Sequence, residues 1–196
     1  DIFLAYCPER ILPGKVIQEV VENDRVIGGI TAKSSEMAVQ FYKHAVKGEC
    51  HVTNARTAEL CKLSENSFRD VNIAFANELS VISEKLGVDV YELIALTNRH
   101  PRVDILRPGT GVGGHCIAVD PWFIVDSAPE EARIIRTARE VNDSKPVWVV
   151  DQIVKLAADI DNPVIACLGL AYKPDVDDLR ESPSVEAVKI LAQRGV

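Results

Sequence analysis

The stretch TAELCKLSENSFRDVNIAFANELSVISEKL, residues 57–86, decides the helical part of the fold of this 196-residue chain. It contains no proline or glycine, and its apolar residues recur at the spacing of one helix face. The pattern predicts a single helix of about 30 residues and about 45 Å that ends at Gly87. A helix of that length commonly crosses an interface. The apolar positions are Leu60, Leu63, Val71, Phe75, Leu79 and Ile82.

The residues before this helix alternate between strand and helix patterns. Ser34 or Ser35 is the expected N-cap of the first helix, because a serine hydroxyl accepts a hydrogen bond from the first turn. The alternation predicts that residues 1–54 are part of an α/β domain. The expected elements are strands at 1–6, 25–30 and 50–53 and a helix over 34–46.

The residues from 55 to 161 predict a helical middle region. Asp89 is the expected N-cap of a helix that runs to about Asn98. The prolines and glycines of residues 100–114 indicate a loop, and regular structure returns near Asp120. Two more helices are expected over 130–142 and 144–160, the second with Pro146 in its first turn, where a missing N–H costs nothing.

Residues 162–196 predict the opening of a second α/β unit. The apolar run at 164–169 is typical of a buried strand, and a helix is expected from about Ser182. Lys173 and Arg180 lie in the loop between them, at the carboxyl end of the strand, where open α/β sheets bind ligands. The alternative is a solvated, charge-balanced turn.

The composition excludes several classes of protein. The 47% hydrophobic and 26% charged residues are typical of a soluble globular protein, and a net charge of -7 argues against a nucleic-acid partner. No apolar run of about 18 residues or signal-peptide start is present, so we expect a cytoplasmic protein without a membrane partner. Five cysteines without a C-x-x-C pair indicate reduced thiols and no metal site.

The best candidate for chemistry is the loop from Gly109 through Gly111, Gly113 and Gly114 to Cys116. Glycines free to adopt positive φ let backbone N–H groups face a ligand beside the thiol. Two alternatives stay open. In the first, the glycines only turn a corner of the chain. In the second, Cys116 is a small buried side chain, as cysteines more often are, and not a nucleophile.

Three polar residues are candidate partners of the thiol. Asp120 follows Cys116 by four residues, which places both on one face if the loop closes into a helical turn; the alternative is an N-cap. Lys62 and Asn66 are also four apart on the predicted long helix. A cation such as Lys62 would stabilise a thiolate or an oxyanion in a dry site, whereas a solvated helix face is the alternative.

Arginines form two groups. Arg102 and Arg107 lie with His100 in the loop before the glycines and are candidates for binding an anionic ligand, because arginine suits bidentate phosphate recognition. Arg133, Arg136 and Arg139 recur at helical spacing near glutamates, which is typical of a salt-bridged surface.

Four motifs in this order resemble those of the nucleotide-sugar 6-dehydrogenases, the family that includes UDP-glucose dehydrogenase. Details in residues 8–14, 98–103 and 114–125 are more similar to the bacterial members that act on UDP-N-acetylmannosamine, with UDP-N-acetylglucosamine enzymes as the close alternative. The four motifs are Cys7-Pro8-Glu9-Arg10, Lys62-x-x-x-Asn66, Gly111-x-Gly113-Gly114-x-Cys116-x-x-x-Asp120, and GLAYKPDVDDLRESP at residues 169–183.

The resemblance implies an α/β fold in three parts. Residues 1–54 would be the tail of an N-terminal Rossmann-like NAD-binding domain, 55–161 an all-helical central domain that dimerises through the long helix, and 162–196 the start of a C-terminal Rossmann-like domain that binds the UDP-sugar. No G-x-G-x-x-G turn is present, so an internal fragment of such an enzyme is expected.

The resemblance also implies roles for single residues. Cys116 would be the nucleophile of two successive oxidations at the sugar C6, through a thiohemiacetal and a thioester, with NAD as the hydride acceptor. The residues that would assist are Lys62, Asn66, Asp120 and Glu9. Those that would bind substrate are Arg102, reaching across a subunit boundary, with Arg107, Gly109, Gly111, Gly113 and Lys173, and those that would contact NAD are Arg180 and Cys116.

Two other functions compete with this one. The first is a catalytically silent module that only binds a sugar nucleotide or dimerises; retention of all the matched site residues argues against it. A thiol-dependent acyl transferase or hydrolase would instead pair Cys116 with His115, His100 or His51 as a base.

Overall fold

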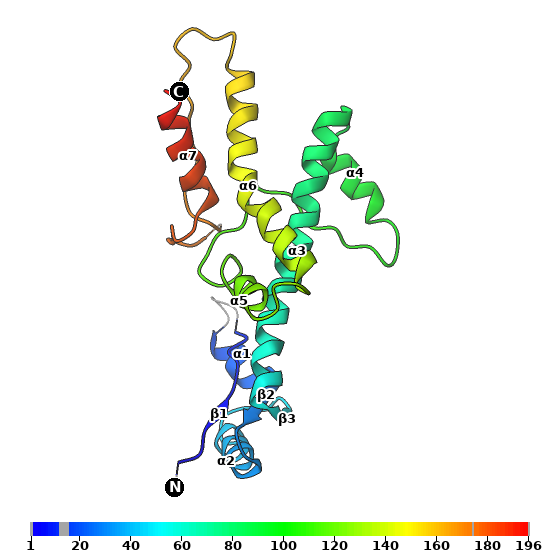
Figure 1. Cartoon of the computed structure of the whole chain (residues 1–196), viewed down its shortest axis with the longest axis vertical. Coiled ribbons are helices and arrows are strands. Elements are labelled where there is room, and N and C mark those ends of the chain that lie inside the picture. The colour runs from blue at the N-terminus through cyan, green and yellow to red at the C-terminus, as the bar shows by residue number, and fades with distance from the viewer. Residues whose placement is uncertain (1, 12–15, 174, 196) are drawn as a thin grey trace. The chain divides into compact units, whose positions relative to one another are not determined.

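The computed structural model describes residues 2–11, 16–173 and 175–195 (Figure 1). The chain forms two compact units, Asp1–Glu65 and Asn66–Val196, and the division falls inside the long helix α3 (Ala55–Leu86). No described helix is long and apolar enough to cross a membrane. The residues of the predicted strand and motifs that lie outside the described residues are Asp1, Pro13, Gly14 and Pro174.

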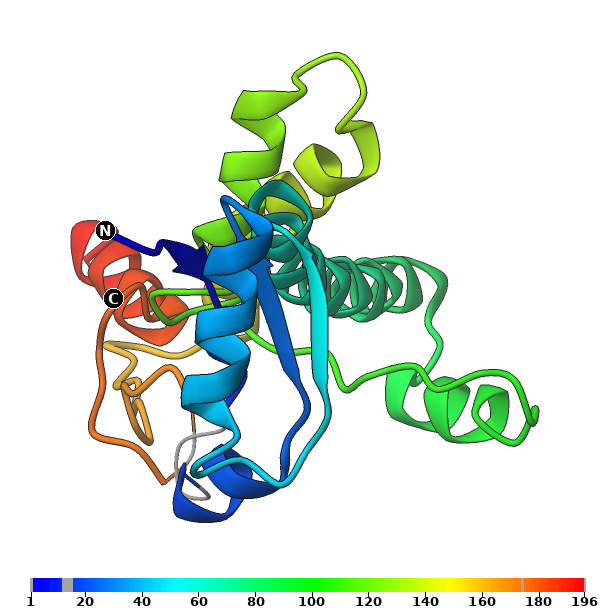
Figure 2. The same ribbon diagram turned by 90° about the horizontal axis from the view of Figure 1, so that it is seen from below.

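The first unit is built on a three-stranded sheet in the order β1 (Ala5–Tyr6), β2 (Arg25–Gly29) and β3 (Cys50–Asn54). β1 pairs with β2 in antiparallel fashion and β2 with β3 in parallel, with Arg25 opposite Cys50. Helix α2 (Ala32–Tyr42) packs against the sheet (Figure 2). The predicted α/β alternation is therefore confirmed.

Three predictions in this unit were wrong in detail. The first strand is shorter than residues 1–6, and α2 is capped by Thr31 instead of Ser34 or Ser35. The reason is a competing hydrogen bond: the Ser35 hydroxyl accepts from the N–H of Gly29 at 3.0 Å, while the Thr31 hydroxyl accepts from Ser34 N at 3.1 Å. Helix α1 (Val16–Glu22) was not predicted, because its β-branched residues disfavour a helix.

Two helices of the second unit begin where the sequence predicted. Besides the second half of α3, the unit contains α4 (Val90–Thr97), α5 (Asp120–Ser127), α6 (Arg133–Leu156) and α7 (Pro183–Gln193). The Asp89 carboxylate accepts from the backbone of Tyr91 at 2.8 Å, as expected of an N-cap. Ser182 is the N-cap residue of α7, and residues 100–114 form the predicted loop.

Helix α6 is one helix where two were predicted. Pro146 lies inside it, and Figure 1 shows α6 changing direction along its length. A proline removes one helical hydrogen bond and bends a helix without necessarily ending it. The helix continues because its buried residues form one stripe on both sides of the proline. They are Ala138, Arg139, Asn142, Lys145, Pro146 and Val150.

The predicted strand at 164–169 is not formed. Val164 is 92% exposed and Leu168 is 98% exposed, and the segment pairs with no strand in the described part of the chain. An extended segment is stable as a strand only beside neighbours that satisfy its backbone and cover its side chains. Its apolar sequence alone does not provide them.

The core of the second unit includes a buried polar network between α3 and α6. Arg139 and Asp70 are 1% and 0% exposed, and the Arg139 Nη1 donates to Asp70 Oδ1 at 2.6 Å. Asn142 also donates to Asp70 Oδ1, at 2.8 Å. The prediction that Arg139 belongs to a salt-bridged surface is wrong, because it lies on the buried stripe of α6.

We expect Arg139→Met to lower the free energy of unfolding by about 3–5 kcal/mol, because it leaves the Asp70 carboxylate buried without its counter-charge. Burial already raises the pKa of Asp70, and Arg139 opposes that rise. A carboxyl with a raised pKa in the folded state loses stability as pH rises above the unfolded value of about 3.9. The deficit, measured by urea unfolding at several pH values, should therefore be smallest in acid.

The matched control is Arg194→Met. Arg194 makes a similar 2.6 Å ion pair with Asp151, but both side chains are exposed. Its loss should cost about 0–1 kcal/mol. Equal costs for the two variants would contradict a structural role for the buried pair.

Candidate active site

Cys116 lies in a turn that leads directly into α5. Its thiol is free and half-buried. Its carbonyl accepts from the backbone N–H groups of Val119 at 3.0 Å and Asp120 at 2.7 Å. The predicted helical turn between Cys116 and Asp120 is therefore confirmed.

Asp120 is held by a side chain from another helix. The Asn66 amide nitrogen donates to Asp120 Oδ2 at 2.5 Å, and Asn66 is only 8% exposed. The interpretation of Asp120 as an N-cap is wrong, because the N-cap position of α5 is Val119 and Asp120 is the first helical residue. A carboxylate there also interacts favourably with the helix dipole. The structure thus brings two of the predicted site residues, Asn66 and Asp120, into direct contact.

The glycine loop packs closely against the chain itself. A Cβ added at Gly113 would lie 2.5 Å from the Tyr172 Cβ and 2.6 Å from the Glu181 carbonyl oxygen. The Gly114 N–H donates to the Arg180 carbonyl at 3.1 Å, and Gly114 has a φ of +88°. At these two glycines the close approach is made by residues 172–181, so the third and fourth sequence motifs form one packed structure.

Arg180 lies near the thiol and is fixed by Asp178. The Arg180 Nη2 donates to Asp178 Oδ2 at 2.7 Å, and Nε donates to Oδ1 at 3.0 Å. These hydrogen bonds, with a smaller contribution from the charge of His115, lower the pKa of Asp178 to about 2. Asp178 raises the pKa of Arg180, to which Tyr172 and Cys116 add. The arginine predicted to contact NAD is therefore within electrostatic range of Cys116.

The other predicted residues lie on loops or in the first unit. Lys173, Arg102 and Arg107 are exposed, and Arg102 N donates to His100 Nδ1 at 3.4 Å. Lys62 is half-buried on α3. The Glu9 carboxylate accepts from the backbone of Arg10 at 2.7 Å and lies 3.4 Å from the Arg25 guanidinium. The roles of all these residues stay predictions.

Asn98 is a structural residue that the sequence did not reveal. Its amide nitrogen donates to the Ile105 carbonyl at 2.9 Å, and its oxygen accepts from the Ile105 N–H at 2.8 Å. This two-way bond closes the residues between them, including Arg102, into an arch. An asparagine just after a helix was the available signal, because its amide satisfies backbone groups where a helix ends.

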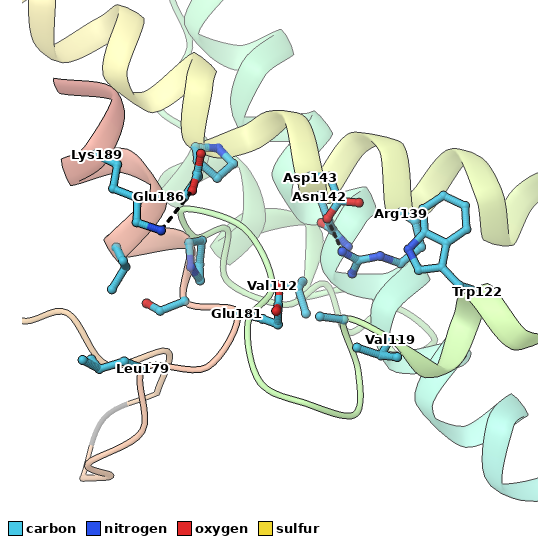
Figure 3. Close-up of a pocket in the computed structure, with 15 residues that line it drawn as sticks. Val112, Val119, Trp122, Arg139, Asn142, Asp143, Leu179, Glu181, Glu186 and Lys189 are labelled. Atoms are coloured by element: carbon cyan, nitrogen blue, oxygen red, sulfur yellow. Dashed lines mark hydrogen bonds and ion pairs between the residues drawn. The ribbon is translucent and has the colours of Figure 1, made fainter. Parts of the chain in front are cut away.

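A polar cavity of about 560 Å³ lies beside the glycine loop in the second unit (Figure 3). Figure 3 shows Val112 of the loop, Trp122 of α5, Asp143 of α6 and Lys189 of α7 around it. Burial raises the pKa of Asp143, which is ion-paired with Arg139. Among the described residues, no cluster of three or more metal-binding side chains is present.

Asn77 and Asn142 were also missed, although they contact the candidate site. Asn77 Oδ1 accepts from the Gly109 N–H at 2.8 Å. Both asparagines occupy buried helix positions. The apolar pattern offered no signal for Asn77, because this residue lies off the face formed by the apolar positions of α3. A polar side chain indicates a buried hydrogen-bonded network only once its burial is known.

We expect Gly113→Ala to destabilise the protein by about 1–3 kcal/mol, because its Cβ would overlap Tyr172 and the Glu181 backbone. Gly109→Ala is the control, since the nearest atom to its Cβ would be 3.9 Å away. Thermal unfolding of both variants checks this. If Gly109→Ala were as destabilising as Gly113→Ala, packing between the loop and residues 172–181 would not be the cause.

Comparison with known proteins finds three domain models of one family along the chain. The matches are to the NAD binding domain of the UDP-glucose/GDP-mannose dehydrogenase family at residues 1–46, to its central domain at 56–144, and to its UDP binding domain at 166–196.

The relatives include a UDP-N-acetyl-D-mannosamine dehydrogenase from Campylobacter jejuni, 67% identical over 98% of this chain and 47% of the relative. An NDP-N-acetyl-D-galactosaminuronic acid dehydrogenase from Ralstonia nicotianae is 64% identical over 99% of this chain and 46% of the relative. A UDP-D-ManNAc dehydrogenase structure from Pyrococcus horikoshii has a TM-score of 0.91 at 44% identity, covering 97% of this chain and 47% of that one. The chain therefore spans about half the length of these relatives.

Proposed function

Because the chain belongs to the UDP-glucose/GDP-mannose dehydrogenase family, we propose that the whole protein containing it oxidises a UDP-sugar at C6 with NAD. The observation that carries the proposal is the contact of Asn66 with Asp120, one helical turn after the half-buried thiol of Cys116. Covalent catalysis needs a nucleophile near a carboxylate that is held in one orientation by a further side chain, and Cys116, Asp120 and Asn66 match this arrangement.

Cys116 supplies the covalent step in this proposal. Its sulfur adds to the C6 aldehyde to give a thiohemiacetal, which keeps the carbon in the site between the two oxidations. The second oxidation leaves a thioester, and water then cleaves the C–S bond to release the carboxylate and restore the thiol. NAD, when bound, accepts the hydride in both oxidations.

Asn66 and Asp120 act on the water and the oxyanions. The Asn66 amide fixes the Asp120 carboxylate in one orientation, from which its other oxygen can orient the attacking water. Lys62 provides a positive charge that favours the thiolate and the oxyanions, and Glu9 is an assisting acidic group of the first unit.

The substrate groups are assigned by charge. Arg102, Arg107 and Lys173 are exposed cations suited to the diphosphate. Gly109, Gly111 and Gly113 are the proposed backbone contacts of the substrate, although the Gly109 N–H binds Asn77 and Gly113 packs against Tyr172. UDP-N-acetyl-D-mannosamine is the proposed sugar nucleotide, supported by the name of the relative at 67% identity. The relative at 64% identity favours an N-acetylgalactosamine derivative as the second candidate.

The described residues fit part of an NAD site. The Arg180 side chain is 63% exposed and binds Asp178 through Nε and Nη2, which leaves Nη1 for a phosphate oxygen. The proposed domains are residues 1–54 for NAD, 55–161 for the catalytic helices and 162–196 for the UDP-sugar. Free thiols at all five cysteines agree with a reducing compartment such as the cytoplasm.

We expect the whole protein, given UDP-N-acetyl-D-mannosamine and NAD, to form about two NADH per sugar oxidised, since alcohol to acid is a four-electron oxidation. The Cys116→Ser variant should form the acid product about a hundredfold more slowly than the wild type, or slower still. The control is Cys167→Ser, because Cys167 is exposed and outside the site. NADH absorbance and product mass provide the measurement.

Formation of only one NADH per sugar, or an undiminished yield of acid from the Cys116→Ser variant, would contradict the thioester mechanism. Parallel reactions with the UDP-linked N-acetylgalactosamine and N-acetylglucosamine sugars identify the substrate. No oxidation of any of them would overturn the proposed function.

The protein is proposed to be a homodimer through α3. Phe68, Phe75 and Ile82 are spaced by seven residues, and they are 71%, 52% and 45% exposed. Apolar residues at that spacing form a helix-packing stripe. We expect Phe75→Asp to convert the dimer to a monomer in light scattering, because it places a charge in the interface. A dimer of unchanged affinity would exclude this stripe as the interface.

A further inference from the structure

A relay of four buried side chains connects the helix core to the loop that precedes Cys116. Its members, Asp70, Asn77, Arg139 and Asn142, are each at most 1% exposed. Arg139 donates to Asp70 at 2.6 Å, and Asn142 Nδ2 donates to the same oxygen at 2.8 Å. Asn77 Nδ2 donates to Asn142 Oδ1 at 2.8 Å, and Asn77 Oδ1 accepts from the Gly109 N–H at 2.8 Å.

The charges at one end fix the direction of every bond in the relay. Asp70 can only accept, so the side of Asn142 that faces it must be the NH2 group. The oxygen of Asn142 is then left facing Asn77, which must donate to it. Asn77 has only its own oxygen left for the loop, and a backbone N–H is the group this oxygen can bind.

Helix α6 meets the loop at a second point. Pro146 has no N–H, so the Asn142 carbonyl has lost its normal helical partner. A Cβ at Gly111 would lie 3.0 Å from this carbonyl oxygen, and Gly111 has a φ of +143°. The backbone carbonyl of Asn142 therefore faces Gly111, while its side chain is linked to Gly109 through Asn77.

The far side of the loop has its own fixed points. Gly114 N bonds to the Arg180 carbonyl at 3.1 Å, and Asp120 is bound to Asn66 at 2.5 Å. Cys116 lies between these two positions. On the N-terminal side, the start of the glycine loop is held at Gly109, whose N–H donates to Asn77.

We propose that Asn77 is a positioning residue, which transmits the fixed polarity of the Asp70–Arg139 pair to Gly109 and so places the Cys116 thiol for reaction. The proposal rests on the proposed function for its catalytic consequence. The relay also predicts that the Gly109 N–H is protected from hydrogen exchange and that Asn77 influences the reactivity of the thiol. These two predictions do not depend on which substrate is oxidised.

Two substitutions in the whole protein test the relay. Asn77→Leu has similar size but leaves both the Gly109 N–H and the Asn142 oxygen unpaired. Asn77→Asp is close to isosteric: when protonated, the introduced carboxyl donates to Asn142 through its O–H and accepts from Gly109 through its C=O. When ionised, it places negative charge against the Asn142 oxygen, which also accepts.

Burial disfavours the ionised form, so the pKa of the introduced carboxyl lies above its usual range. The Asn77→Asp variant should match the wild type in acid and lose kcat relative to it, up to about a hundredfold, as pH rises through that pKa. This trend opposes that of a thiolate, which gains reactivity with rising pH. Asn77→Leu should lose kcat at every pH.

The readouts are kcat and KM, hydrogen exchange at the Gly109 amide, and the rate of Cys116 alkylation by iodoacetamide, each as a ratio to wild type. Val150→Ala is the stability control, because Val150 is a fully buried residue of α6 outside the relay. It should lower Tm while leaving Gly109 exchange and kcat near wild type.

Faster Gly109 exchange in Asn77→Leu at every pH, together with Cys116 alkylation that changes with pH in Asn77→Asp, supports the relay. A kcat loss in step with these changes supports positioning. Unchanged exchange in both variants overturns the relay. Changed exchange with unchanged kcat overturns the positioning role. If the wild type oxidises no UDP-sugar while exchange and alkylation follow the expected trend, the proposed function fails and the relay stands.

Discussion

The buried ion pair of Arg139 and Asp70 is the constraint on which the rest of the second unit depends. An ion pair out of water is costly unless nearly all of its hydrogen-bonding capacity is used. Asn142 uses part of that capacity, while Asp70 Oδ2 and Arg139 Nε are buried without a hydrogen-bond partner among the described residues. The chain of amides that begins at Asn142 ends at the backbone of the glycine loop. The hydrogen bonds that stabilise the buried ion pair therefore also fix the backbone conformation of the glycine loop at the candidate site.

Packing completes what the polar network begins. The loop is held on one side by hydrogen bonds and on the other by close contact, because Gly113 and Gly114 leave no room for a side chain beside Tyr172. α5 then begins one turn after Cys116, with Asp120 already bound to α3 through Asn66. The fold thus brings together Cys116 and Asp120 of the loop and α5 with Arg180, although these segments lie far apart in sequence.

The sequence predicts those features that are determined locally. The length of α3 follows from its uninterrupted apolar period, and the Asp89 cap and the start of α7 near Ser182 follow from local sequence signals. The spacing of Cys116 and Asp120 is compatible with a helical turn, and the structure forms that turn. Features that depend on distant partners were missed: α6 continues through Pro146 because its buried face is continuous, and Val164–Gly169 does not become a strand without neighbours. The burial of Asn77 and Asn142 depends on partners in other segments, which the apolar pattern does not identify.

The contact between Gly113 and the Tyr172–Glu181 segment has a consequence for protein engineering. Because the Tyr172 side chain and the Glu181 backbone occupy the space in which a side chain at Gly113 would lie, the two segments must come from the same parent protein. A chimera that joins the helical region of this chain to the C-terminal domain of a distant relative therefore needs its crossover before the glycine loop or after α7, and not in the connecting stretch between α6 and residue 172.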